Sequence, residues 1–373
     1  MEFSYWEHQT WFSDIDFTVI GSGIVGLSCA LQLKEKHPKA SILVLEKGIL
    51  PQGASTKNAG FACFGSVSEL LSDLTQSSEE EVINLVKQRL DGLNSLRQLV
   101  GDKNLDYKPW GGYELFSNNQ KNSYEECLNN LPRINKLLHS VYNESIYETK
   151  ENPFGFENIK SKTIFNKYEG QLNTGKMMDE LLKLAYKKDI KVINSISVSG
   201  FETIGKTVLV KTDKINFKTN QLFIATNGFS SELGIEKVKP ARAQVLITKP
   251  IPNLKIQGTF HLDEGYYYFR NIDDRILFGG GRNLDFKAEE TSEFGQTDLI
   301  QNKLELILNT VILPNTPYEI DHRWSGIMGV GNQKSPLISS LTDKIHYGVR
   351  LGGMGVAIGN QVGKKLADLI SQS

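Results

Sequence analysis

The chain has 373 residues, of which 39% are apolar, and its 42 lysine and arginine residues almost balance 43 aspartate and glutamate residues. This length exceeds the usual size of one hydrophobic core, so we expect two domains. The near-zero net charge argues against recruitment by nucleic acid or an anionic membrane. Three cysteines and six histidines are dispersed, which argues against a disulfide framework and a metal site and favours a reducing, cytoplasmic compartment.

The N-terminal segment, residues 1–14, contains Trp6, Trp11 and Phe12 among acidic residues. It lacks the basic start and the apolar core of a signal peptide. No later stretch approaches the roughly 20 apolar residues needed to cross a bilayer. We expect the aromatic residues of the segment to pack against the rest of the chain, and contact with a membrane surface is the alternative.

Residues 15–46 predict a strand, a glycine turn, a helix and a second strand that ends in an acid. The apolar run leads into Gly21-x-Gly23-x-x-Gly26, after which apolar residues recur at helical spacing. The backbone N–H groups of such a turn bind a pyrophosphate, and Glu46, 20 positions after Gly26, suits an adenosine ribose. The predicted dinucleotide-binding residues of this unit are Gly21, Gly23, Ile24, Val25, Gly26, Glu46 and Lys47.

A loop of small and polar residues, 53–65, follows the second strand and is too long for a simple turn. Its polar side chains suit the phosphates and ring of a flavin, and a flexible surface connection is the alternative. The predicted cofactor-binding residues of the loop are Ser55, Thr56, Asn58, Ala59 and Gly60. Cys63 could hold a flavin covalently, but its apolar surroundings favour an inert buried thiol.

Beyond this loop the pattern alternates between helices and strands. The capping pattern Ser78-x-x-Glu81 predicts the start of a long helix. Further predicted elements are strands at 113–116, 191–193, 198–203, 207–212, 221–225, 244–248, 266–269, 276–278 and 344–349, and helices at 119–138 and after a cap at Thr174. Open α/β sheets bind ligands at the carboxyl ends of their strands. The predicted cofactor-binding residues in these segments are Val198, Thr226, Asn227 and Gly228.

Two glycine clusters mark the last segment. The first, 324–331, precedes a strand, and the second, 352–355, opens the C-terminal helix. A glycine-rich helix N-terminus is a second anion site, suited to a flavin carbonyl whose negative charge grows on reduction, and close helix packing is the alternative. The predicted cofactor-binding residues here are Gly326, Gly353, Met354, Gly355 and Val356.

Taken in order, these pieces resemble one family. They are Gly21-x-Gly-x-x-Gly26 with Glu46, Ser55-Thr-Lys-Asn-Ala-Gly60, Ala225-Thr-Asn-Gly228, Tyr268-x-Arg270 before Gly279-Gly-Gly281, Trp324-x-Gly326 and Gly353-x-Gly355. The chain is similar over residues 17–370 to the FAD-dependent D-amino-acid oxidase family, which includes glycine oxidase, sarcosine oxidase and gamma-glutamylputrescine oxidase. The last of these types is the most similar.

The resemblance implies FAD as cofactor and an α/β fold, with a Rossmann-type FAD-binding domain and a second α+β substrate domain on a mixed, mainly antiparallel sheet. We expect the FAD-binding domain at 1–85, 156–238 and 323–373, and the substrate domain at 86–155 and 239–322. A small amine or amino-acid substrate binds between the two domains in such enzymes.

The chemistry implied by the resemblance is hydride removal from the carbon beside an amine nitrogen, hydrolysis of the resulting imine and transfer of electrons to O₂. The protein must then remove water from the amine and hold its C–H near the flavin. We expect Tyr267 and Tyr268 to form walls and hydrogen bonds, and Arg270 and Met328 to line the pocket. Aromatic residues of alternating strands more often belong to the core, so we expect one of the two tyrosines to face away.

Met328 departs from the family, because amino-acid oxidases of this family have there an arginine that holds the substrate carboxylate. Amines, or amino acids with a distant carboxylate, are therefore favoured unless Arg270, Arg323 or Arg350 takes over that role. Arg350 and Met354 also replace the family's usual residues, which are glycine and a histidine or asparagine.

Four alternatives stay open. The substrate could be a 2-hydroxy acid, or the electron acceptor could be a quinone. The chain could also be a catalytically idle flavin-binding protein, because the family's arginine is missing. A nicotinamide cofactor is the remaining enzyme hypothesis, and the extra elements at 55–60 and 353–355 argue against it.

Overall fold

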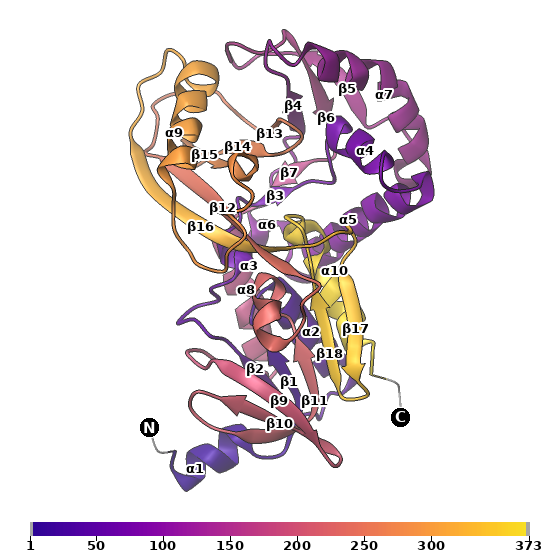
Figure 1. The fold of residues 1–373 in the computed structure, drawn as a ribbon, viewed down its shortest axis with the longest axis vertical. Coiled ribbons are helices and arrows are strands. Elements are labelled where there is room, and N and C mark those ends of the chain that lie inside the picture. The colour runs from indigo at the N-terminus through magenta and orange to yellow at the C-terminus, as the bar shows by residue number, and fades with distance from the viewer. Residues whose placement is uncertain (1–2, 371–373) are drawn as a thin grey trace.

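The computed structural model describes residues 3–370, which form two parts, each built on an eight-stranded sheet (Figure 1). The expected fold class, a Rossmann-type α/β domain with a second domain on a mixed sheet, is confirmed. The FAD-binding domain was expected to include residues 1, 2 and 371–373, which lie outside the described residues. No helix within 3–370 is long and apolar enough to cross a membrane.

The first sheet has a parallel centre. In spatial order its strands are β17 (Leu337–Thr342), β18 (Ile345–Val349), β11 (Phe217–Ile224), β1 (Ile15–Ile20), β2 (Ile42–Leu45) and β8 (Lys191–Ile193), with β10 (Thr207–Thr212) and β9 (Val198–Ile204) attached through β11. Neighbours from β18 to β8 run parallel, so β1 and β2 are buried on both faces and carry apolar residues almost throughout. The carboxyl ends of β11, β1 and β2 therefore meet at one edge of the sheet.

Helices cover this sheet in the lower part of Figure 1. They are α2 (Ile24–Lys36), α3 (Ala54–Lys57), α5 (Glu79–Val100), α6 (Asp102–Leu105), α8 (Thr174–Lys187) and α10 (Gly355–Ala367), with short turns α1 (Tyr5–Glu7), η1 (His8–Phe12) and η2 (Asn227–Leu233). The capping box of Ser78 and Glu81 at the start of α5 is confirmed. The cap of α8 is Asn173, one residue before the expected Thr174, because its side-chain oxygen accepts the Lys176 N–H.

The second sheet is antiparallel except where β13 pairs with β4. In spatial order its strands are β16 (Ile320–Val330), β12 (Lys239–Thr248), β15 (Arg275–Gly280), β14 (Tyr267–Ile272), β13 (Thr259–Leu262), β4 (Gly112–Leu115), β6 (Lys162–Asn166) and β5 (Tyr147–Glu151). Around it lie α4 (Val67–Leu74), α7 (Lys121–Tyr142), α9 (Asp298–Ile307), η3 (Arg282–Leu284) and η4 (Leu308–Ile312). A two-stranded sheet of β3 (Phe61–Ala62) and β7 (Gly170–Gln171) completes the set. Phe260, Phe269 and Phe278 pack in the hydrophobic core on the outer face of the second sheet. The functional site can therefore lie only on the inner face of this sheet.

Sheet pairing and helix packing move three of the expected domain boundaries. Residues 162–166 form β6 of the second sheet, although 156–238 were expected in the FAD-binding domain. Residues 86–100 were expected in the substrate domain, but α5 packs on α10 so closely that a Cβ on Gly92 would lie 2.3 Å from the Ala357 carbonyl oxygen. The last boundary follows Val330, because the whole of β16 pairs with β12.

Candidate active site

A cavity of about 1000 Å³ lies between the two sheets. One side of it, the nucleotide wall, consists of the carboxyl ends of β1, β2 and β11, the α3 segment and the N-terminus of α10. The other side, the sheet wall, consists of residues from β12, β13, β14 and β16 together with Phe61 of β3. The two walls enclose one continuous space, large enough for a dinucleotide and a small substrate.

The glycine turn after β1 leaves backbone exposed to the cavity. Gly21 has φ +99°, and a Cβ there would lie 2.9 Å from the Ala225 carbonyl oxygen. A Cβ on Gly23 would lie 2.7 Å from Ser55 Oγ, which accepts the Ile24 N–H at 3.0 Å. Gly23 supplies no side-chain cap to α2, so the positive end of this helix opens on the cavity.

Glu46 lies buried at the end of β2 and faces the cavity. Its Oε2 accepts the N–H of Ser22 at 3.1 Å and the hydroxyl of Ser22 at 2.7 Å, while Oε1 accepts the N–H groups of Gly48 and Gln52 at 3.0 and 3.3 Å. The carboxylate thereby fixes the glycine turn and the loop after β2 relative to each other. It is placed to share an oxygen with a ribose hydroxyl.

The N-terminus of α10 provides the second backbone site. Gly353, with φ +85°, and Gly355 line the cavity, and Met354, at the N-cap position, makes no side-chain cap. Two other glycines of α10 allow it to pack closely against α2. A Cβ on Gly363 would lie 2.5 Å from the Val25 carbonyl oxygen, and a Cβ on Gly359 would contact Ile24. Close packing thus involves Gly359 and Gly363, and anion binding at Gly353 and Gly355 stays a prediction.

Most of the predicted cofactor-binding residues line the cavity together. They are Gly21, Gly23, Ile24, Val25, Glu46, Lys47, Ser55, Asn58, Ala59, Val198, Thr226, Asn227, Gly326, Gly353, Met354, Gly355 and Val356. The hydroxyl of Thr226 is buried there without a hydrogen-bond partner in the described chain, so a bound polar group could complete it.

Four predicted cofactor residues lie behind the cavity surface instead. A Cβ on Gly26 would lie 1.8 Å from the Gly21 carbonyl oxygen, and one on Gly228 would lie 2.5 Å from that of Met328, so both permit close backbone packing. The Gly60 carbonyl oxygen accepts a hydrogen bond from the buried guanidinium of Arg270, and the Thr56 hydroxyl donates a hydrogen bond to the Pro51 carbonyl oxygen at 2.6 Å. These residues shape the site from outside it.

The two tyrosines expected at the substrate site face opposite sides of β14. Tyr268 lines the cavity and packs edge-on against Phe61, with ring centroids 5.6 Å apart. Tyr267 belongs to the outer core beside Phe278, so it is the tyrosine that faces away and its expected catalytic position is wrong. Successive side chains of a strand alternate between faces. Burial raises the pKa of Tyr268 to about 12, which keeps its hydroxyl protonated as a hydrogen-bond donor.

The expectation that Arg270 lines the substrate pocket is also wrong. Its buried Nη1 donates to the carbonyl oxygens of Gly60 and Leu172 at 3.0 and 2.8 Å, and it does not line the cavity. Burial lowers the pKa of Arg270 to about 10. The residue ties the two parts of the molecule together.

Of the other expected anion-binding arginines, Arg323 pairs with Glu305 at 2.6 Å outside the cavity. Arg350 lines the cavity, but its two terminal nitrogens donate to the carbonyl oxygens of Lys334 and Gly331. Met328 lines the cavity as expected, and its sulfur lies 3.6 Å from the position of a Cβ on Gly353.

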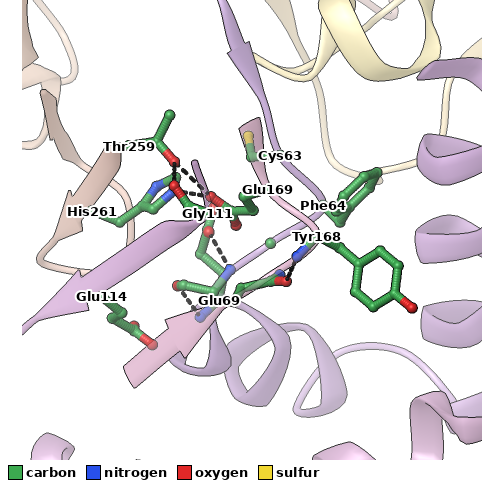
Figure 2. Close-up of polar contacts among 12 residues, drawn as sticks. Cys63, Phe64, Glu69, Gly111, Glu114, Tyr168, Glu169, Thr259 and His261 are labelled. Carbon is green, nitrogen blue, oxygen red and sulfur yellow. Dashed lines mark hydrogen bonds and ion pairs between the residues drawn. The ribbon is translucent and has the colours of Figure 1, made fainter. Parts of the chain in front are cut away.

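A buried ion pair supports the sheet wall. His261 Nε2 lies 2.8 Å from Glu169 Oε2, which also accepts the Thr259 hydroxyl at 3.1 Å (Figure 2). Burial alone would lower the pKa of His261, but the charge and hydrogen bond of Glu169, with contributions from Glu69 and Glu114, raise it to about 9. The imidazolium therefore persists at neutral pH while its ring, 5.4 Å from that of Phe61, lines the cavity.

Sequence reasoning missed several residues of the sheet wall and its rim, among them Phe61, Val245, His261 and Arg282. His261 and Phe61 carry no motif, because they lie 200 positions apart and meet only through packing of their rings in the folded chain. Arg282 had a signal, since it directly follows the glycine run 279–281 that ends a predicted strand.

Cys63 lies buried in the cavity lining, with its sulfur 3.7 Å from that of Met354. Burial first, and then the charges of Glu169 and Glu69, raise the pKa of its thiol well above the ordinary value. A protonated thiol is a poor nucleophile, which supports the inert role expected of it.

Comparisons with known proteins agree with this arrangement. A family model described as FAD dependent oxidoreductase matches residues 16–369. A curated relative, the probable oxidoreductase OrdL of Haemophilus influenzae, is 22% identical over 377 residues, covering 95% of this chain and 82% of the relative.

Two solved structures share the fold. The glycine oxidase of Bacillus cereus matches with a TM-score of 0.76 and 15% identity, over 95% of this chain and 97% of that one. The L-proline dehydrogenase of P. horikoshii matches with a TM-score of 0.74 and 17% identity, over 96% of this chain and 94% of that one. The open glycine turn, the placed carboxylate and the unpartnered Thr226 hydroxyl fit the dinucleotide that the matched family binds.

Proposed function

Since the chain belongs to the family of FAD dependent oxidoreductases, we propose that it oxidises the C–N bond of an amine or amino acid, with O₂ as the final electron acceptor. The observation that carries this proposal is the single cavity whose nucleotide wall fits FAD and whose sheet wall is aromatic and largely apolar. The imine that forms is then hydrolysed by water.

FAD supplies the two-electron acceptor when it is bound. The exposed backbone at Gly21 and Gly23 would hold its pyrophosphate, and Glu46 its ribose. The uncapped start of α10, at Gly353 to Gly355, presents further N–H groups to the same space.

The sheet wall can exclude water from the reacting amine. Phe61, Val245 and Tyr268 line the cavity and pack with one another on the inner face of the second sheet. An apolar surface disfavours a charged ammonium group, so it favours the neutral amine whose lone pair assists removal of the adjacent hydrogen. The protonated Tyr268 hydroxyl can orient the substrate by donating a hydrogen bond.

A substrate screen without oxygen tests this proposal. Amines and amino acids, including N-substituted ones, are mixed with the FAD-loaded protein, and loss of visible flavin absorbance is followed. We expect bleaching by at least one amine and formation of peroxide when air is admitted.

Three results would contradict the proposal in different ways. Bleaching by 2-hydroxy acids alone would favour hydroxy-acid oxidation. Reoxidation by a quinone and not by air would replace O₂ as the acceptor. A protein that binds FAD but bleaches with no compound of either class would be catalytically idle.

A further inference from the structure

We propose that Arg282 binds a carboxylate of the substrate, so that the preferred amines carry an anionic group several bonds from the reacting carbon. This inference deepens the proposed function and rests on it. It comes from a cation in the cavity wall that has no counter-ion within residues 3–370.

The backbone directs Arg282 toward the cavity. The residue follows Gly280 and Gly281, whose φ angles are +124° and +79°, and a Cβ on Gly280 would lie 2.0 Å from the Tyr266 carbonyl oxygen. Only glycine fits this close approach of β15 to β14. The resulting turn places Arg282 in the cavity lining at the end of the strand.

The Arg282 side chain is partly buried, yet it forms no hydrogen bond or ion pair with any residue within 3–370. Its guanidinium carbon lies 4.7 Å from the centre of the Phe286 ring, which leaves the N–H groups available. Five donors in a rigid fork match a carboxylate, and a partly desolvated guanidinium gains more from such a partner than an exposed one does.

The acidic residues nearest in the chain form no ion pair with Arg282 within residues 3–370. Asp285 accepts the Ala288 N–H at 2.9 Å. Glu289 accepts two hydrogen bonds from Arg242, at 2.9 and 2.7 Å, and Glu290 pairs with Lys239 at 2.9 Å. Glu264 and Glu293 are exposed residues of the cavity lining, and neither forms an ion pair with Arg282 in the described chain. The other guanidinium groups in the lining, those of Arg89 and Arg350, donate to backbone carbonyls.

The position of Arg282 suggests the length of the substrate. Arg282 follows β15 and Met328 lies on β16, with β12 between these strands, so the two positions are about 10 Å apart across the sheet at the usual strand spacing. A carboxylate held by Arg282 is therefore displaced from one held at position 328. Short α-amino acids would not span both positions.

The test compares two inert probes of equal size, pentanoate and pentanamide, on FAD-loaded protein. Binding is measured by perturbation of the flavin spectrum and by the shift in unfolding temperature, so the result does not depend on turnover. We expect the unaltered protein to bind pentanoate at least tenfold more tightly than pentanamide. Arg282→Met should erase this preference, and Arg282→Lys should retain part of it, because lysine keeps the charge without the fork.

Arg323→Met is the matched control, because it removes an arginine outside the cavity and should leave the preference unchanged. A second arm measures flavin bleaching by 5-aminopentanoate and by pentylamine, and we expect Arg282→Met to lower the ratio of their kcat/KM values by about fiftyfold.

Absence of a pentanoate preference in the unaltered protein, or its persistence in Arg282→Met, would overturn the assignment. If Arg282→Met loses FAD, a full-strength preference in Arg282→Lys would overturn it as well. Failure of every amine to bleach the flavin would reject the proposed function, while the inert probes would still decide the role of Arg282.

Discussion

The nucleotide wall of the cavity is made mainly of backbone, whereas the sheet wall is made of side chains. Gly21, Gly23 and Gly353 expose N–H groups at the ends of two helices, and the chain nearby leaves no room for larger residues at the first two. Tyr268, His261 and Met328 come from three different strands. Binding of the cofactor should therefore depend on steric fit, and choice of substrate on charge and side-chain shape.

The largest effect is expected on the nucleotide wall. Gly23→Val would force a branched side chain into the space beside Ser55 Oγ, so we expect FAD affinity to fall by at least about a thousandfold. The measurement is FAD retained after purification and regained on addition. Gly200→Val is the control, because a Cβ at Gly200 meets no atom within 4 Å. Normal FAD binding by Gly23→Val would show that the pyrophosphate lies elsewhere.

The buried pair of the sheet wall should make stability depend on pH. The pKa of His261 is raised from 6.5 to about 9 in the folded protein, so the pair contributes fully below pH 6.5 and its contribution is lost as the pH rises through 9. The expected loss in the free energy of unfolding is up to about 3 kcal/mol.

Denaturant titrations between pH 6 and 10 measure this loss. Glu169→Gln removes the charge that raises the pKa of His261, so its stability should be lower at pH 6 and less dependent on pH in this window. An unaltered protein whose stability does not change between pH 6 and 10 would contradict the assigned charge of the pair.

Substrate choice should respond to Met328. Amines or amino acids with a distant carboxylate should exceed glycine and D-alanine by roughly a hundredfold in kcat/KM, because a buried α-carboxylate beside Met328 would lack a charged partner worth about 2–3 kcal/mol. Met328→Arg should shift this ratio toward small α-amino acids. Steady-state rates on both substrate sets give the result, and a preference of the unaltered enzyme for glycine or D-alanine would refute it.

The two faces of β14 offer a smaller contrast. Tyr268→Ala removes a ring from the cavity and should lower kcat/KM about tenfold through loss of substrate positioning. Tyr267→Phe alters the outer core and should leave kcat/KM within about twofold, with its effect confined to stability. A larger change in kcat/KM for Tyr267→Phe than for Tyr268→Ala would reverse the assignment of the faces.

No effect on cofactor attachment is expected from Cys63. Its buried, protonated thiol should leave the flavin unattached, so denaturation should release all the yellow colour into the supernatant for both the unaltered protein and Cys63→Ala. Colour that stays with the precipitated chain, and is lost in Cys63→Ala, would identify a covalent link.

The elements of the nucleotide wall could be predicted because each is local. The turn from β1 to α2, the acid at the end of β2 and the glycines before α10 are read from neighbouring residues. The strand β16 was not predicted, because Gly326 and Gly329 are poor strand formers; pairing with β12 along its length overrides that propensity. Because this strand was not predicted, the last domain boundary was expected before residue 323, whereas it follows Val330.

The sequence by itself determined the family, the cofactor and the fold class, because backbone turns that bind a dinucleotide need glycine and an acid at fixed separations. Only the tertiary structure decided which side chains face the cavity. The face of Tyr268 depends on strand register, and the hydrogen bonds of Arg270 depend on carbonyls about 100 and 210 positions away. Within residues 3–370 Arg282 has no ion-pair partner, in part because Glu289 and Glu290 pair with other cations. Such contacts join residues distant in the chain, so no local pattern encodes them.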